Sequence, residues 1–305
     1  MPRPNTFVIG APKCGTSTIY SYLAPHPEVF MSAVKEPHYF AVGSAYRYID
    51  NEPMYLELFA DAKPGTKIIG EASTTNFHTP GAIENVHKFA PDAHIVAAVR
   101  NPIDLVPSLH GHLLYWQFED VEDFEEAWRL WPERAIGQKL PTGIKKPDIT
   151  QLSYGEMGLL GKHLKHIYEV FPREQVHILA MDDIRDDSVG TYRKLLSFLD
   201  LKDDGRTEFE KKNAARTHGK AKFITKLATN IPAPIRRIAH KFGLKNTGIV
   251  AGINSKFADW ETKKQISPEL RQELVDFYRE DVGLLSELLG RDLSGWLKPK
   301  ALEAK

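Results

Sequence analysis

Cysteines, excess charge and long hydrophobic segments are all scarce in this sequence. Cys14 is the only cysteine among 305 residues, so no disulfide can form within the chain and nothing indicates an oxidising compartment. The apolar run near the N-terminus, Phe7-Val-Ile9, is too short for a signal peptide core. No other stretch approaches the ~20 apolar residues that a spanning helix needs. We therefore expect a cytoplasmic protein without a membrane span.

The formal net charge of the chain is zero at pH 7. Lysine plus arginine and aspartate plus glutamate each number 40. A general binder of nucleic acid or anionic membranes is normally basic, so we expect no nucleic-acid partner. Residues 211–258 nevertheless contain eleven lysines or arginines and no acid. This local excess of positive charge is suited to an anionic ligand.

The alternation of apolar segments predicts an α/β fold. Short apolar runs alternate with longer amphipathic stretches, which is typical of a parallel sheet flanked by helices. We expect one domain over residues 1–305, with the core in 5–220 and a basic segment plus a C-terminal helix in 221–305 that packs on it. The expected strands are 6–9, 67–70, 94–99 and 176–180, and the expected helices are 17–23, 81–89, 103–116, 154–171, 187–199 and 268–289.

Two further segments have distinctive compositions. Residues 130–150 carry three prolines and two glycines, which predicts a long loop of the kind that often covers a substrate. Residues 119–126 hold six acids, which we interpret as the solvated start of a helix.

The segment Gly10-Ala-Pro-Lys-Cys-Gly-Thr-Ser-Thr18 predicts a phosphate-binding loop. It follows an apolar strand and precedes a helix, so its N–H groups and the positive end of the helix point at one spot. The spacing nearly matches the Walker A loop, but Thr16 occupies the lysine position and Lys13 lies inside the loop. A lysine placed earlier suits a ligand with one 5′-phosphate and a small leaving group beyond it. We expect a P-loop-like three-layer fold.

This loop resembles the 5′-phosphosulfate loop of the sulfotransferases that use 3′-phosphoadenosine-5′-phosphosulfate (PAPS). The resemblance is strongest to the branch that contains heparan sulfate sulfotransferases and bacterial sulfotransferase domains. It implies PAPS as co-substrate, 3′,5′-ADP as product and no metal. It also implies that Lys13 contacts the 5′-phosphate and the oxygen that bridges to sulfur. The other nucleotide-binding residues of the loop would be Cys14, Gly15, Thr16, Ser17 and Thr18.

A second motif resembles the family's 3′-phosphate site. The strand expected at 94–99 is followed by Arg100, and Ser108 comes eight residues later on the next helix. A guanidinium at a strand end can make a paired contact to phosphate, which a hydroxyl completes. The family also closes a basic loop over the nucleotide, for which Arg216 and Lys220 are the candidates in this chain.

A third motif, Lys35-Glu-Pro-His-Tyr-Phe40, resembles the family's catalytic segment. There the acidic residue is taken as the general base, which implies this role for Glu36. We expect Glu36 and His38 on one side of an extended segment, since Pro37 favours that shape at the residue before it. His38 could orient the acceptor, hold Glu36 or stabilise the sulfuryl oxygens. Some members carry a lysine where this chain has Ala72.

Together these motifs predict an enzyme that transfers a sulfuryl group from PAPS to a hydroxyl or amine of a carbohydrate or small molecule. One alternative is a P-loop phosphotransferase with a displaced lysine, in which Asp182 or Asp183 would bind magnesium. The other is a non-catalytic nucleotide-binding module. The sequence leaves the acceptor and the oligomeric state open.

Overall fold

The computed structural model describes residues 1–144, 146–209 and 266–298. Arg216, Lys220 and the basic tract 211–258 lie outside the described residues. The chain divides into two compact units, which we call the sheet unit and the helical unit. The sheet unit combines Met1–Val106, Gly155–Lys212 and Arg271–Lys305, and the helical unit combines Pro107–Tyr154 and Asn213–Leu270.

The sheet unit contains a five-stranded sheet in the order β2-β3-β1-β4-β5, with all paired strands parallel. In register, Val8 lies opposite Ala72 on one side and Val96 on the other. The interior strand β4, between β1 and β5, is apolar and almost wholly buried, as expected of a strand covered on both faces. The strands are β1 (Thr6–Val8), β2 (Val29–Met31), β3 (Ile68–Ala72), β4 (His94–Val99) and β5 (Val176–Ala180).

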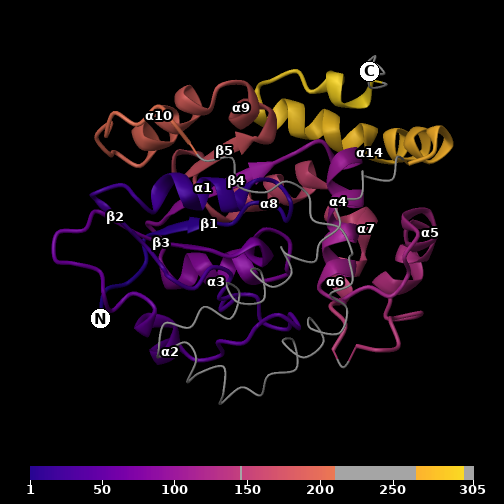
Figure 1. Cartoon of the computed structure of the whole chain (residues 1–305), viewed down its shortest axis with the longest axis horizontal. Coiled ribbons are helices and arrows are strands. Elements are labelled where there is room, and N and C mark those ends of the chain that lie inside the picture. Colours follow the sequence, from indigo (N-terminus) through magenta and orange to yellow (C-terminus); the bar gives the residue numbers. More distant parts are fainter. Residues whose placement is uncertain (145, 210–265, 299–305) are drawn as a thin grey trace. The chain divides into compact units, whose positions relative to one another are not determined.

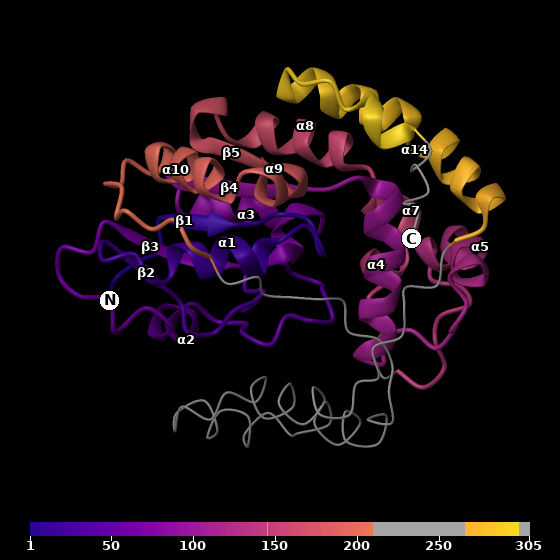
Figure 2. The same ribbon diagram turned by 45° about the horizontal axis from the view of Figure 1, so that its top comes forward.

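Helices lie on both faces of this sheet (Figures 1 and 2). In the sheet unit they are α1 (Thr16–Leu23), α2 (Glu52–Glu57), α3 (Ala82–Phe89), α8 (Leu160–Val170), α9 (Met181–Asp186) and α10 (Ser188–Phe198). The described residues also form the short 3₁₀ helices η1 (Thr74–Phe77) after β3, η2 (Arg173–Gln175) before β5 and η3 (Ser294–Leu297) after the last helix. The α/β fold with a parallel sheet that the sequence predicts is confirmed.

The expected strands 94–99 and 176–180 are confirmed to the residue, whereas β2 was not expected. The single helix expected at 154–171 is wrong, because it divides into α7 (Tyr154–Met157) and α8. The break lies beside Gly158, where a Cβ atom would come within 2.5 Å of the Tyr278 ring. Tyr278 belongs to α14 (Pro268–Leu289), whose bounds agree with the expected helix. A packing partner more than a hundred residues away therefore sets this boundary.

The helical unit contains α5 (Phe124–Ala135), α6 (Ile149–Leu152) and most of α4 (Pro102–Tyr115). The Asp123 carboxylate caps α5 by accepting from the N–H groups of Glu125 and Glu126. The expected loop at 130–150 is therefore wrong at both ends, since α5 continues through Pro132 and α6 begins at Ile149.

Candidate active site

The predicted phosphate loop and its neighbours lie at the carboxyl edge of the sheet. The loop follows β1, Arg100 follows β4, and Ser73 to Thr75 follow β3. The chain leaves β1 toward β2 and β3 on one side and reaches β4 and β5 on the other, so the strand order reverses at β1. Open parallel sheets bind ligands outside the carboxyl ends of the strands at such a reversal.

Two glycines shape the loop after β1. A Cβ atom on Gly10 would come within 2.3 Å of the Ala98 backbone nitrogen, so only glycine fits against β4 there. Gly15 has φ 91° and forms the N-terminal boundary of α1, which no side chain caps. The N–H groups of a helix's first turn have no acceptors within the helix. The start of α1 is therefore suited to an anion.

Lys13 and Arg100 belong to the same site. The Arg100 guanidinium donates to the Lys13 carbonyl oxygen at 3.3 Å, which joins the loops after β1 and β4. Lys13 itself has φ 64°, an uncommon conformation for a residue with a side chain. Asn101 begins α4 by accepting from the Ile103 N–H, and its amide donates to the Trp296 carbonyl. The position of Arg100 is thus held from both sides.

The remaining loop residues are placed less uniformly. Cys14 is fully buried, and its N–H donates to the Ala11 carbonyl at 3.2 Å. Burial raises the pKa of the Cys14 thiol to about 12, against the opposing charges of Arg100 and Lys13. Thr16 is buried, whereas Ser17 and Thr18 are half-buried. Ser108 lies on α4 and is half-buried, two positions beyond the last residue of that part of the sheet unit.

Glu36 is held by hydrogen bonds to three residues. One of its carboxylate oxygens accepts from Lys35 Nζ at 2.6 Å, and the other accepts from the N–H and hydroxyl of Thr74 at 2.9 and 3.0 Å. Its backbone N–H donates to the Ala72 carbonyl, which ties the segment to the end of β3. Burial acts to raise the pKa of Glu36, but the charges of Lys35 and His38 and the bonds from Lys35 and Thr74 lower it to about 2.

His38 faces the same carboxylate. His38 Nε2 lies 3.6 Å from Glu36 Oε2, and Nδ1 is 2.8 Å from the Thr75 hydroxyl. The two side chains do meet, but the extended segment expected from Pro37 is wrong. Glu36 has φ 62° and His38 has φ 54°, so both lie in the left-handed region. Together with Lys13 they are three of the six non-glycine residues with positive φ in the described part of the chain. Strained conformations of this kind gather at functional sites.

Aromatic packing fixes the far end of this segment. The Phe40 ring packs edge-on against Phe7 of β1, with the ring centres 5.6 Å apart. Tyr39 stacks on Tyr55 of α2 at 4.4 Å, and Tyr55 is fully buried. The turn that carries Glu36 and His38 is therefore anchored to the core.

Glu71, at the carboxyl end of β3, is a site residue that the sequence analysis missed. It is fully buried and accepts from the Ser73 hydroxyl at 2.7 Å and from the Asn76 amide at 3.1 Å. Ser73 in turn accepts from the His38 N–H at 3.0 Å. Burial raises the pKa of Glu71 to about 8, and the charge of Glu36 adds to this against the hydrogen bonds from Ser73 and Asn76. A signal was present in the sequence, since Glu71-Ala-Ser-Thr-Thr-Asn76 is an unusually polar continuation of a buried strand.

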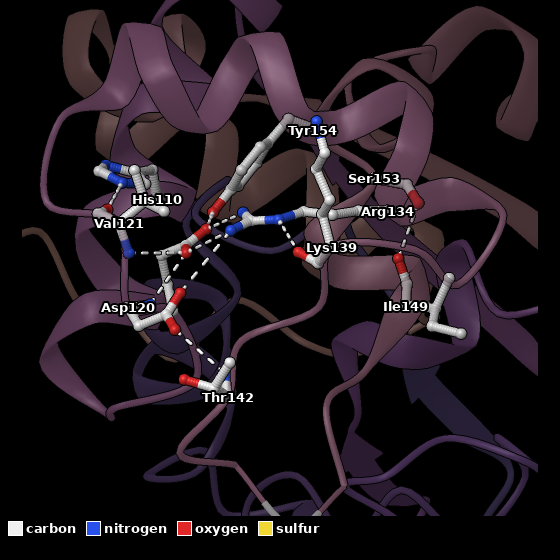
Figure 3. Close-up of polar contacts among 10 residues, drawn as sticks. His110, Asp120, Val121, Arg134, Lys139, Thr142, Ile149, Ser153 and Tyr154 are labelled. Carbon is white, nitrogen blue, oxygen red and sulfur yellow. Dashed lines mark hydrogen bonds and ion pairs between the residues drawn. The ribbon is translucent and has the colours of Figure 1, made fainter.

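The acidic tract 119–126 is only partly the solvated helix start that we expected. Glu119 is fully buried and paired with Arg134, which is 1% exposed. Its carboxylate also accepts from the Tyr154 hydroxyl at 2.7 Å and from the N–H groups of Asp120 and Val121. Figure 3 shows Arg134, Tyr154 and Asp120 pointing toward one another within the helical unit. Only Asp123 and the glutamates after it begin a helix at the surface.

The acids of the alternative phosphotransferase have other partners. Asp182 accepts from the Trp296 ring N–H at 2.7 Å and pairs with Arg185, while Asp183 pairs with Arg291. In residues 1–144, 146–209 and 266–298, no group of three histidine, cysteine or acidic side chains could hold a metal ion. Across the same residues, no helix combines the length and apolar character needed to cross a membrane.

Comparisons with known proteins identify the family to which this chain belongs. Residues 3–286 match the family described as Sulfotransferase domain. The crystal structure of a sulfotransferase from Alicyclobacillus acidocaldarius is 27% identical, with a TM-score of 0.69 over 98% of this chain and 100% of that one. Carbohydrate sulfotransferase 15 from Homo sapiens is 27% identical, covering 65% of this chain and 44% of its own length.

Heparan sulfate glucosamine 3-O-sulfotransferase 6 from Homo sapiens is 26% identical, again over 65% of this chain and over 53% of the relative. The chain thus spans about half the length of the curated relatives that it matches. The resemblance inferred from the phosphate loop is confirmed. The chain belongs to the sulfotransferase domain family.

Proposed function

We propose that this protein transfers a sulfuryl group from PAPS to a hydroxyl, or alternatively an amine, of a carbohydrate-type acceptor. The observation that carries the proposal is the contact between Arg100 and the Lys13 carbonyl at the reversal of strand order. It brings a lysine-bearing anion loop and a guanidinium together at one edge of the sheet. Such a pair suits a nucleotide that is phosphorylated at both its 5′ and 3′ positions.

The residues present fit this nucleotide. Gly10 leaves no room for a side chain against β4, and the uncapped start of α1 offers backbone donors to a 5′-phosphate. Lys13 is the candidate for the leaving oxygen and Arg100 for the 3′-phosphate, while Ser108 remains a candidate by resemblance. Cys14 would contribute through its backbone alone, since its side chain is buried. Arg216 and Lys220 remain candidates by resemblance.

In the proposed reaction PAPS supplies an activated sulfur–oxygen bond. That bond breaks as a new one forms from sulfur to the acceptor oxygen. Lys13 then neutralises the charge that develops on the departing phosphate. Glu36 takes the proton of the acceptor hydroxyl, so charge and atoms balance. No redox partner is required.

Glu36 is suited to the role of base in one respect and limited in another. Thr74 fixes one carboxylate oxygen, while the other accepts from Lys35 and retains a lone pair for the acceptor. However, a pKa of about 2 makes a weak base, since transfer is most efficient near the working pH. Movement of Lys35 away from Glu36 and toward the bound substrates would raise the pKa of Glu36. His38, 3.6 Å away, is the alternative base.

Carbohydrate acceptors are proposed because the curated relatives carry carbohydrate and heparan sulfate in their names.

An acceptor screen tests this class. Purified protein is incubated with sulfur-labelled PAPS and a panel of oligosaccharides, phenols and amines. Labelled oligosaccharide is the expected product. Labelled phenol or amine alone would refute the acceptor class.

Thermal shift with 3′,5′-ADP, 5′-AMP and ATP separates the proposal from its alternatives. Stabilisation by 3′,5′-ADP beyond 5′-AMP is expected, because a ligand that binds only the folded state raises its stability by mass action. Magnesium-dependent stabilisation by ATP would instead favour a phosphotransferase. Nucleotide binding without transfer to any acceptor would favour a binding module.

A further inference from the structure

Glu71 is a buried acid for which the proposed transfer has no direct use. Its side chain is fully buried at the end of β3, and its two oxygens accept from the neutral groups of Ser73 and Asn76. Among the described residues, no lysine, arginine or histidine forms an ion pair with it. The titratable groups that act on it there are Glu36 and Lys35 from the catalytic segment and Tyr55 from α2.

A carboxyl group in this setting favours its neutral form. Burial without a counter-ion strongly disfavours a charged carboxylate. Glu36 adds a second obstacle, because it is already ionised and a nearby like charge disfavours another. Pairs of acids with divergent environments often mark the division of roles in a catalytic site.

Glu71 is also connected to the catalytic turn. It binds the Ser73 hydroxyl, and that hydroxyl accepts from the His38 N–H at 3.0 Å. His38 and Glu36 both have positive φ, a conformation that persists only where the surroundings enforce it. The chain from Glu71 through Ser73 to the His38 backbone is one such restraint.

We propose that Glu71 is a positioning residue that holds the His38 turn through Ser73 and that must be neutral for sulfuryl transfer, because its ionisation would bring a second carboxylate charge beside Glu36. This inference rests on the proposed function. When Glu71 loses its proton, a second negative charge lies beside Glu36 and next to a site for anions. Turnover should then fall as the pH rises through about 8, the raised pKa of Glu71.

The first test compares the wild type with Glu71→Gln, which keeps the shape and is permanently neutral. Under saturating PAPS and acceptor, wild-type kcat should fall about tenfold per pH unit above the transition. Glu71→Gln should remain active and lose this alkaline decline. Glu57→Gln, an exposed glutamate on α2, is the matched control and should keep the wild-type profile. An alkaline decline that survives in Glu71→Gln, or is missing in the wild type, overturns the proposal.

A second variant tests the connection if Glu71→Gln fails to fold. The hydrogen bond from Ser73 lowers the pKa of Glu71, so Ser73→Ala should move the alkaline decline to higher pH. It should also lower kcat about tenfold while the Kd of 3′,5′-ADP stays the same, since the turn is loosened but the phosphate loop is untouched. An unshifted decline with normal kcat would count against the proposed role.

Stability gives a readout that does not depend on turnover. The folded protein holds a proton on Glu71 between the ordinary glutamate pKa of roughly 4.3 and about 8, whereas the unfolded chain has released it. Wild-type stability should therefore decline with rising pH in this window relative to Glu71→Gln. If this difference is present but no transfer from PAPS occurs, the proposed function is wrong, whereas the conclusion that Glu71 is neutral in the folded protein holds. If transfer occurs without the difference, the inference about Glu71 is wrong.

Discussion

Removing Arg134 should destabilise the protein far more than removing any surface charge. Arg134 and Glu119 form an ion pair whose side chains are 1% and 0% exposed. Arg134→Met keeps most of the side chain's volume but leaves the Glu119 carboxylate buried without its counter-ion. The hydrogen bonds from Tyr154 and from the N–H groups of Asp120 and Val121 remain, yet none of these donors carries a charge.

The expected loss follows from the burial of the pair. Breaking a buried ion pair by removing one partner costs about 3–5 kcal/mol, because the remaining charge is uncompensated. Exposed pairs contribute only ~0–1 kcal/mol. At about 2–4 °C per kcal/mol, Arg134→Met should lower Tm by roughly 6–20 °C. The matched control is Arg129→Ala on the same helix, whose partner Glu125 is 46% exposed, and it should change Tm by at most a few degrees.

Thermal and urea unfolding of the full chain measure this difference. Trp128 and Trp131 lie on α5 beside Arg134, so their fluorescence reports on the helical unit. Glu119→Leu combined with Arg134→Met should recover part of the loss, because no unpaired buried charge remains although the donors of Tyr154, Asp120 and Val121 lose their acceptor. If Arg134→Met costs no more than Arg129→Ala, the pair is not the restraint that its burial indicates.

At acid pH, the difference in the free energy of unfolding between the wild type and Arg134→Met should become smaller. Burial acts to raise the pKa of Glu119, but the bonds from Arg134, the Val121 N–H and Tyr154 hold it below its ordinary value. A depressed folded pKa contributes stability above the unfolded value of roughly 4.3, and this contribution is lost as the pH falls through the folded pKa. The variant lacks that contribution and protonates more easily. A gap that stays constant from pH 7 to pH 3 would contradict this reasoning.

Three predictions concern the transfer site itself. Lys13→Ala should lower kcat by about 10²–10³-fold while the Kd of 3′,5′-ADP rises much less, since its charge acts mainly in the transition state; equal losses in both would make it a binding residue. Arg100→Ala should weaken the binding of 3′,5′-ADP by about 10–100-fold and the binding of 5′-AMP little, as isothermal titration would measure. Equal losses of affinity for the two nucleotides would show that Arg100 does not contact the 3′-phosphate. Glu36→Gln should abolish turnover without weakening the binding of 3′,5′-ADP, whereas His38→Gln should keep a measurable fraction of wild-type turnover. The reverse order of activities would make His38 the base.

Much of the fold, and the part of the site formed by the phosphate loop and Arg100, follow from local sequence. The strand–loop–helix around Gly10 and Gly15 is encoded within about a dozen residues, because tight turns and anion loops depend on nearby glycines and helix starts. The buried strand β4 and the long helix α14 carry periodic patterns strong enough to define their ends. Parallel connectivity then brings Arg100 to the edge that carries Lys13.

Tertiary structure alone decided the properties that depend on burial. The acids Glu71 and Glu119 look alike in sequence, and each precedes other polar residues. Glu71 is buried beside another carboxylate and forms no ion pair with a described residue, whereas Glu119 is buried against Arg134, so their pKa values move in opposite directions. The left-handed turns at Glu36 and His38 are likewise imposed by distant contacts with Ala72, Ser73 and Thr74 rather than by Pro37. Desolvation and charge pairing act through space between segments far apart in the chain, so a local pattern does not reveal them.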